Sequence, residues 1–315
     1  MITDNYEYIN VRLIAHSTSD LDNQIATFEL EYPRYIHSEI MTHRMFSRNA
    51  QSSRAVPVAK TSEINALNPV KPLLWGKNKA GMSSVEELEG SELLVAKMHW
   101  SNAAEESFNR SKQMSDAGLH KQWANRITEW CSRIKVVVTA TEWDNYFWLR
   151  DDEDAAQPEI VYLARKMKEV LNASTPELLS PGEWHTPYVE HKRGADGVLR
   201  YFDTNGNQLT TEEALKISAS CCGQVSYRKL DDSKEKALEI YQKLFSGPKP
   251  HLSPVEHQAT PIDHHKMTNF TNSSDPFSWE HGITHMDSNY DLWSANFKGW
   301  IQYRQILSTV GDVNP

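Results

Sequence analysis

The sequence is poor in cysteine, with only Cys131, Cys221 and Cys222 among 315 residues. These three residues form neither a disulfide framework nor a paired C-x-x-C metal site. This excludes a small domain stabilised by disulfides and one stabilised by a cysteine-bound metal. A low cysteine content is typical of a reducing compartment. The first residues carry no signal pattern, and no apolar run is long enough to span a bilayer. The sequence therefore predicts a cytoplasmic protein with no membrane partner.

The chain also lacks an excess of basic charge, since 33 Lys and Arg residues stand against 42 Asp and Glu residues and the net charge is −9. A nucleic-acid-binding surface is therefore not expected. Neither a Walker A motif nor a Gly-rich dinucleotide fingerprint is present. Any bound nucleotide must then be held by side-chain donors. A length of 315 residues allows one large domain or two ordinary ones.

Residues 42–54 stand out against this acidic background. They include three arginines, one histidine, one asparagine and three serines, and no acid. So many cations repel one another unless an anion lies among them, which favours a phosphate or dinucleotide site. A solvated basic loop is the alternative. A strand predicted at 25–32 and a helix predicted at 34–41, which begins after Pro33, lead into this cluster.

Hydrophobic periodicity and turn residues predict the remaining elements. Strands are expected at 8–16 and 134–141. The proline-bearing stretch 56–90 is expected to be a long loop. The composition shifts around 175–211, where Thr204-Asn205-Gly206-Asn207 is expected to be a hairpin turn or an exposed insertion. Helices are expected at 91–113, 120–130, 142–150, 158–170, 211–222, 233–245 and 293–307, and residues 261–291 are expected to be irregular.

Three further clusters contain residues that could carry chemistry. Arg126 and Arg150, on predicted helices, are either ligand-binding cations or ordinary helix-end residues. Asn145 lies in an aromatic segment, where a buried amide either ties down backbone or contacts a ligand. Glu256 and His257 end a polar run that lacks the additional ligands of a metal site, so no metal is expected there. An orienting Glu–His pair beside a ligand is expected instead.

These residues match three motifs, through which the sequence resembles the flavin-dependent thymidylate synthases. The family hallmark is Arg-His-Arg, two residues, Ser, one residue, Asn, two residues, Ser, one residue, Arg. Thr42 replaces its first arginine, and the other positions are His43, Arg44, Ser47, Asn49, Ser52 and Arg54. The second motif comprises Arg126, the strand at 134–141, Asn145, Leu149-Arg150 and Ala156-Gln157-Pro158-Glu159-Ile160. The third comprises Gln224-Val225-Ser226-Tyr227, a helix, and His251-Leu252-Ser253-Pro254-Val255-Glu256-His257.

The order of the motifs differs from the usual one, in which the third motif precedes the strand that leads into the Arg-His-Arg helix. The sequence therefore resembles a circularly permuted member, an arrangement that is tolerated when the natural termini lie close together. The resemblance predicts a catalytic core at 1–174 and an insertion or linker at 175–211. It predicts permuted elements and an added helix at 212–315, packed into the same domain. The end of the chain resembles a bacteriophage-type branch, which would act in the host cytoplasm.

The resemblance implies an α+β fold, that is, a mixed α/β subunit with an antiparallel-rich sheet, assembled as a homotetramer with active sites shared between subunits. It implies FAD, NAD(P)H and methylenetetrahydrofolate acting on the small-molecule substrate dUMP. From their positions in the family motifs, Arg150 and Ser52 would be catalytic. Substrate would be bound by Ser52, Arg54, Arg126 and Arg150, and cofactor by His43, Arg44, Ser47, Asn49, Asn145, Glu256 and His257. No cysteine nucleophile is required, which agrees with Cys221 and Cys222 as core residues.

Departures from the family pattern leave the substrate base and the product open. Thr42 and Gln224 each stand where the family has an arginine near the cofactor. The expected reaction is synthesis of dTMP from dUMP. The alternatives are a dCMP methylase or a pyrimidine-nucleotide hydroxymethylase on the same fold, or a non-catalytic protein that binds flavin or nucleotide.

Overall fold

A five-stranded sheet forms the centre of the computed structural model, which describes residues 6–81, 84, 86–225, 230–245, 249–264 and 279–307. Its strand order is β3-β4-β2-β1-β5, antiparallel throughout except for the pair of β1 and β5. The strands are β1 (Asn10–Thr18), β2 (Gln24–Pro33), β3 (Ser47–Ala50), β4 (Arg133–Ala140) and β5 (Glu177–Leu178).

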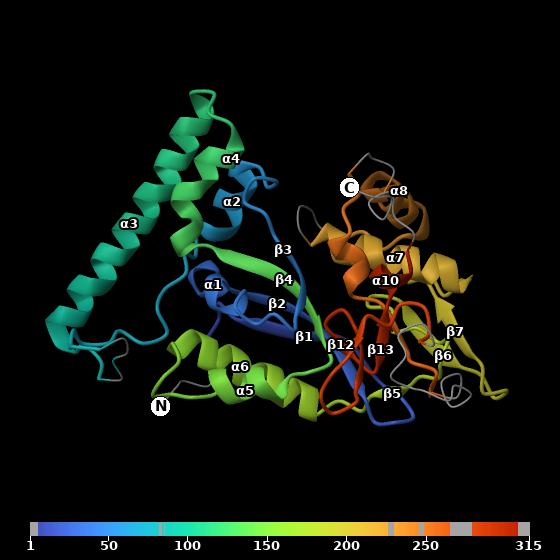
Figure 1. The fold of residues 1–315 in the computed structure, drawn as a ribbon. Coiled ribbons are helices and arrows are strands. Elements are labelled where there is room, and N and C mark those ends of the chain that lie inside the picture. Colours follow the sequence, from blue (N-terminus) through green and yellow to red (C-terminus); the bar gives the residue numbers. More distant parts are fainter. Residues whose placement is uncertain are drawn as a thin grey trace.

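The two faces of the sheet pack against different parts of the chain, because successive side chains of a strand point to opposite sides. On one face, Phe28 of β2 and Val136 of β4 join a core cluster with α5 (Asp144–Arg150) and α6 (Pro158–Asn172). On the other face, Val137 packs on Cys222 and Val225. The sheet therefore lies between the helices of the first half and those of the second half (Figure 1).

The first half carries helices around the β3 edge. They are η1 (Arg34–Ile36), α1 (His37–Ile40), α2 (Val58–Asn65), α3 (Gly90–Asp116), α4 (Lys121–Ala124) and η2 (Asn125–Cys131). The long helix α3 projects from the body of the molecule in Figure 1. Its N-terminal half exposes the apolar residues Leu94, Val95 and Met98.

The second half combines helices with small sheets. A capping box of Thr210 and Glu213 begins the first helix by satisfying free backbone N–H groups. The helices are α7 (Thr211–Gln224), α8 (Lys234–Phe245), η3 (Ser253–Glu256) and α10 (Tyr303–Ile306). The strands are β6 (Glu190–Arg193), β7 (Leu199–Phe202), β8 (Gln208–Leu209), β9 (Ala259–Pro261), β10 (His285–Met286), β11 (Leu292–Ser294), β12 (Phe297–Lys298) and β13 (Trp300–Gln302).

The predicted α+β class with an antiparallel-rich sheet is confirmed, but two predicted segments are wrong. The stretch 56–90 is not one loop, because Val58–Asn65 forms α2 after Pro57. The helix predicted at 293–307 is absent except for the short α10, and the segment forms β11, β12 and β13. Positive φ angles at Ala295 and Gly299, 53° and 71°, turn the chain there and end any helix.

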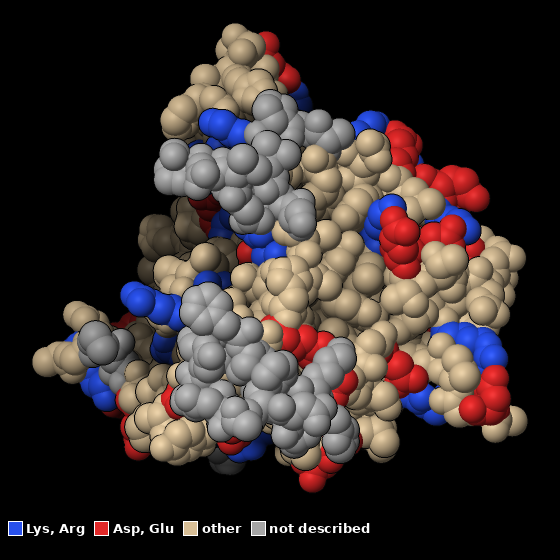
Figure 2. Space-filling view, turned by 45° about the vertical axis from the view of Figure 1, so that its right-hand side comes forward, with Lys and Arg blue, Asp and Glu red and all other residues tan. Residues whose placement is uncertain are grey.

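The predicted division at residues 174 and 211 stays a prediction. Segment 175–211 contributes to a core cluster shared with α7, in which Trp184 and Tyr201 pack near Leu215. None of the helices within the described ranges is both long and apolar enough to cross a bilayer. On the face shown in Figure 2, acidic and basic side chains are interspersed outside the grey residues.

Candidate functional site

Arg150, the last residue of α5, turns its guanidinium toward the end of α1. Its Nε donates to Nε2 of His43 at 2.9 Å, and Nη1 lies 3.2 Å from Oε2 of Glu39. Its Nη2 donates to Oγ1 of Thr42 at 3.1 Å. Because a guanidinium only donates, Nε2 of His43 accepts and the ring proton of neutral His43 lies on Nδ1.

The imidazole of His43 is neutral. Burial, followed by the positive charges of Arg150 and Arg48, lowers the pKa of His43 to about 4. The ring stacks on Phe46, with centroids 5.5 Å apart, and meets Tyr146 edge-on. Nη1 of Arg48 donates to the carbonyl of His43 at 3.1 Å, which fixes the turn between α1 and β3. His43 is therefore held as a rigid neutral group beside a permanent cation.

A cavity of about 710 Å³ opens next to this junction. Arg150 and Glu39 border it, together with the aromatic side chains of Tyr35, Trp100 and Trp130. Flat aromatic walls with a few charged groups at one end are typical of a site for a planar polar ligand.

A second group of motif residues lies where β3 meets η3. Oγ of Ser47 lies 3.2 Å from Nε2 of Gln302, which also donates to the carbonyl of Glu256 at 3.2 Å. The amide of Asn296 donates to the same Oγ at 3.1 Å. The third motif thus lies against the first one, although more than 200 residues separate them in the sequence.

Two buried side-chain nitrogen atoms in this region have no hydrogen-bond partner within the described residues. They are Nδ2 of Asn49, whose residue is 4% exposed, and Nε2 of His257, which is fully buried. Burial lowers the pKa of His257 to about 3, so its ring is neutral. Burial raises the pKa of Glu256, and the charges of Arg304 and Arg48 oppose that rise. Unsatisfied buried polar atoms are rare and point to a missing partner such as a ligand.

The end of the donor cluster borders a cavity of about 450 Å³. Asn49, Ser52 and Arg54 line one side, and His251 and Ser253 of the third motif line another. The Arg54 side chain is exposed. Residues Ser226 and Tyr227 of the third motif lie outside the described residues.

The remaining predicted site residues are not brought into these groups. Arg44 and Asn145 are exposed, so the expectation of a buried amide at Asn145 is wrong: it is the second residue of α5 and its side chain faces outward. Arg126 is also exposed and pairs with Glu129 at 3.0 Å on η2. Among the residues that the structure describes, no three His, Cys, Asp or Glu side chains cluster as metal ligands would.

Sequence reasoning missed several contacting residues. The contact of Glu39 with Arg150 was not predicted, because an acid on a short helix usually faces solvent. Gln302 and Asn296 were hidden by the wrong helix prediction for the end of the chain. Thr139, whose Oγ1 lies 2.8 Å from Nδ1 of His257, was missed because it lies inside a β-prone run, where a threonine is an ordinary strand residue.

Comparisons with known proteins identify the family of the chain. The family model described as thymidylate synthase complementing protein matches residues 3–177, more than half of the chain. The chain belongs to this family, the flavin-dependent thymidylate synthase family, so the predicted resemblance is confirmed. The matched residues contain the first two motifs, whereas the third motif, at 224–257, lies beyond them, and the circular permutation stays a prediction. It is a thymidylate synthase-like methyltransferase.

Other comparisons add little. No curated protein matches the chain. Solved structures that match include the UMP/dUMP methylase PolB from Streptomyces cacaoi bound with 5-Br UMP, at 18% identity and a TM-score of 0.41, covering 51% of this chain and 87% of that one. The same protein bound with 5-Br dUMP matches at 16% identity and a TM-score of 0.41, covering 51% and 89%.

Proposed function

We propose that the chain makes dTMP from dUMP, with methylenetetrahydrofolate as carbon donor, FAD as bound cofactor and NAD(P)H as reductant. The observation that carries this proposal is the match to the family model together with the junction of Arg150, His43 and Glu39 beside the 710 Å³ cavity. The proposed location is the cytoplasm, because Cys131, Cys221 and Cys222 are all free and buried.

The residues present fit a flavin. The unpartnered donors of Asn49 and His257 are the kind of group that binds carbonyl and ring-nitrogen acceptors. We assign the cofactor to Asn49, His257, Glu256 and Ser47, with His43 and Arg44 from the first motif and Asn145 at the start of α5. When bound, the flavin supplies hydride-transfer chemistry that no side chain offers.

Arg150 has the features of a group that stabilises negative charge on the pyrimidine. Its guanidinium stays protonated at any working pH. The acceptors at His43, Glu39 and Thr42 hold it in one orientation, so little reorganisation is needed when charge develops on the substrate. Thr42, which replaces the family arginine, accepts from Arg150 and removes one competing cation from this position. Ser52, with Arg54, would orient the nucleotide from the 450 Å³ cavity.

Within the described residues, the proposed nucleotide-binding arginines lie at different cavities. Arg150 borders the 710 Å³ cavity, Arg54 the 450 Å³ cavity, and Arg126 binds Glu129, which lines a third cavity of about 230 Å³. We propose that a single nucleotide meets these arginines where copies of the chain adjoin. Their position at different cavities supports the proposed homotetramer with shared sites.

A mixing experiment tests the shared site. Arg54→Ala and Arg150→Ala are purified separately, each with little activity, then mixed, unfolded and refolded together. If each active site takes Arg54 from one copy and Arg150 from another, each of the two arginines is intact with a probability of about one half. Random assembly then restores about a quarter of the wild-type activity. Activity that stays at the level of the single variants would contradict a shared site.

A spectral experiment tests the cofactor assignment. The purified protein is expected to be yellow, with flavin absorbance bands. With oxygen excluded, its reduced flavin is expected to reoxidise only when dUMP and methylenetetrahydrofolate are both present, with dTMP formed. Asn49→Ala should lose flavin on dilution, whereas Asn207→Ala, in the turn between β7 and β8, should keep it. A colourless, flavin-free wild type would contradict the assignment.

A further inference from the structure

A chain of buried polar side chains crosses the central sheet and ends on His257. Ser17 is 2% exposed, and Thr27, Thr139, His185 and His257 are fully buried. Oγ of Ser17 lies 2.9 Å from Nδ1 of His185, and Nε2 of His185 lies 2.9 Å from Oγ1 of Thr27. Oγ1 of Thr27 lies 2.7 Å from Oγ1 of Thr139, which lies 2.8 Å from Nδ1 of His257.

The register of the sheet places these groups in one row. Thr27 of β2 and Thr139 of β4 are directly opposed, so both side chains point to the same face. Ser17 of β1 is opposite Ile25, one diagonal step from Thr27 on that face. The row therefore continues across three strands and needs no special backbone geometry.

His185 comes from segment 175–211, whose role the sequence leaves open. Its backbone N–H donates to the carbonyl of Ala259 at 2.8 Å, and the N–H of Ala259 donates back to the carbonyl of His185 at 3.3 Å. Ala259 begins β9, two residues after His257. The two histidines are thus fixed relative to each other by a backbone pair as well as by the side-chain row.

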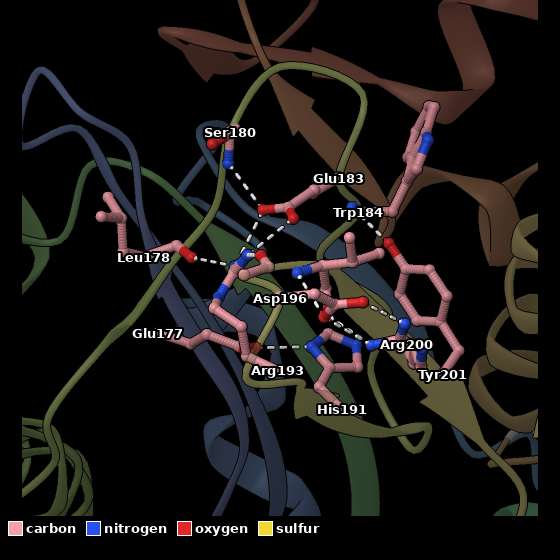
Figure 3. Close-up of polar contacts among 12 residues, drawn as sticks. Glu177, Leu178, Ser180, Glu183, Trp184, His191, Arg193, Asp196, Arg200 and Tyr201 are labelled. Atoms are coloured by element: carbon pink, nitrogen blue, oxygen red, sulfur yellow. Dashed lines mark hydrogen bonds and ion pairs between the residues drawn. The ribbon is translucent and has the colours of Figure 1, made fainter.

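Neighbouring polar contacts hold the loop that carries His185 (Figure 3). Arg193 binds both carboxylate oxygens of Glu183 at 2.8 Å and the carbonyl of Leu178 at 2.7 Å. The hydroxyl of Tyr201 accepts from the N–H of Trp184, the residue before His185, at 2.8 Å. These contacts join the part of the loop before His185 to the small sheet of β6 and β7.

A second histidine ties down the other side of the loop. Nδ1 of His191 lies 2.6 Å from the carboxylate of Glu177, and Nε2 lies 2.6 Å from the hydroxyl of Thr186. This order of hydroxyl, imidazole and carboxylate resembles a nucleophile triad, but its contacts join Thr186 of the loop to His191 of β6 and Glu177 of β5. The arrangement therefore serves to hold the loop.

The row has only two self-consistent arrangements of its protons. Burial lowers the pKa of His185 well below its ordinary value and the pKa of His257 to about 3, so each ring is neutral and carries one N–H. Each hydroxyl of Ser17, Thr27 and Thr139 also supplies one proton. Reversing only part of the row would make one threonine hydroxyl accept two hydrogen bonds and leave its own buried proton without an acceptor in the row, so the arrangements compared are the two in which every hydrogen bond points the same way.

The two arrangements differ in the number of groups left unsatisfied. When Ser17 donates to His185, each group donates to the next, Thr139 donates to Nδ1 of His257, and the proton of His257 lies on Nε2. In the reverse arrangement Ser17 keeps a buried hydroxyl proton for which the described part of the chain offers no acceptor, and Nε2 of His257 lacks a donor as well. Buried hydroxyl protons without an acceptor are disfavoured.

We propose that His185, through Thr27 and Thr139, is a positioning residue that holds His257 as the neutral Nε2–H tautomer. The Nε2–H, which has no acceptor within the described residues, is then available as a hydrogen-bond donor for a carbonyl oxygen or ring nitrogen of a bound ligand. Segment 175–211 thereby acts on the site from the opposite end of the row without touching the ligand. The proposal rests on the proposed function only where it identifies that ligand as flavin.

Histidine tautomers are measured directly by ¹⁵N NMR on protein labelled at its histidine nitrogens, without added ligand. The resonances of His257 are assigned by their loss in His257→Gln. In the wild type, Nε2 is expected to show a one-bond coupling to hydrogen and Nδ1 to be unprotonated. Thr139→Val and the milder Ser17→Ala should each move a measurable share of the proton to Nδ1. Thr128→Val and Ser111→Ala, both buried and outside the row, are the matched controls.

A binding measurement links the row to the site. Ser17→Ala should weaken flavin binding by about two- to tenfold, the range for one hydrogen bond, and should have no effect in a His257→Gln background. Circular dichroism confirms that each variant is folded.

The results separate the two proposals. A wild-type His257 protonated on Nδ1, or a tautomer unchanged in both Thr139→Val and Ser17→Ala, overturns the positioning role whatever the enzyme's activity. A confirmed tautomer in a protein that binds no flavin leaves the row in place and overturns the cofactor assignment alone.

Discussion

Arg150→Ala is the change that most directly tests the proposed chemistry. The guanidinium is a preoriented cation, and loss of one such charge-stabilising donor costs about 2.7–4 kcal/mol of transition-state stabilisation, or 10²–10³-fold in kcat. The loss of folding stability should be much smaller. The side chains of Arg150 and Glu39 are 19% and 30% exposed, and a pair partly open to solvent contributes about 1 kcal/mol or less.

The assay follows dTMP formation at saturating dUMP, with thermal unfolding measured on the same samples. Arg165→Ala is the matched control, because Arg165 also pairs with acids, Asp151 and Glu153, but on the exposed face of α6. Arg150→Ala should also raise the pKa of His43 above about 4, since the charge of Arg150 is the second cause of its lowering. A kcat within threefold of the wild type would refute the proposed role of Arg150.

Two further predictions concern stability. The pKa values of His37 and His43 are lowered to about 4 and that of His257 to about 3, so below about pH 6.5 the unfolded chain takes up protons that the folded chain does not. The free energy of unfolding should therefore fall as pH decreases from 6.5 to 4, by up to about 1.4 kcal/mol per pH unit for each histidine. Urea titrations at several pH values measure this fall, which should be shallower in His257→Gln. Gly299→Ala should lower the free energy of unfolding by about 1–3 kcal/mol, because its φ is +71° and a Cβ would lie 2.5 Å from Asn23. Gly118→Ala, also at positive φ but with open space around it, should cost less, and equal losses would contradict the steric argument.

The elements with clear periodicity were predictable from the sequence. The strand predicted at 25–32 is β2, and the helix predicted at 158–170 is α6, which begins at Pro158. Both have strong local signals: alternation in the first, and a proline at the first turn before an amphipathic stripe in the second. The end of the chain was mispredicted because spacing of Trp300, Tyr303 and Arg304 fits a helix, while the turns at Ala295 and Gly299 depend on tertiary packing.

The site was predictable as a set of motifs but not as a geometry. The motif residues His43 and Arg150 are in contact, as are the first and third motifs through Ser47 and Gln302. The roles assigned to these residues remain predictions. The row from Ser17 to His257 could not be predicted, because threonines in strands and a histidine in an irregular segment carry no local signal. Their contact depends on strand register and on the loop that inserts His185.

The product formed from each pyrimidine monophosphate tests the central claim most directly. The flavin-loaded protein is supplied with NADPH and methylenetetrahydrofolate labelled at its transferable carbon, and dUMP or dCMP is offered in turn. The expected result is labelled dTMP from dUMP and no product from dCMP. Labelled 5-methyl-dCMP, a 5-hydroxymethyl product, or no transfer of label to dUMP would contradict the account.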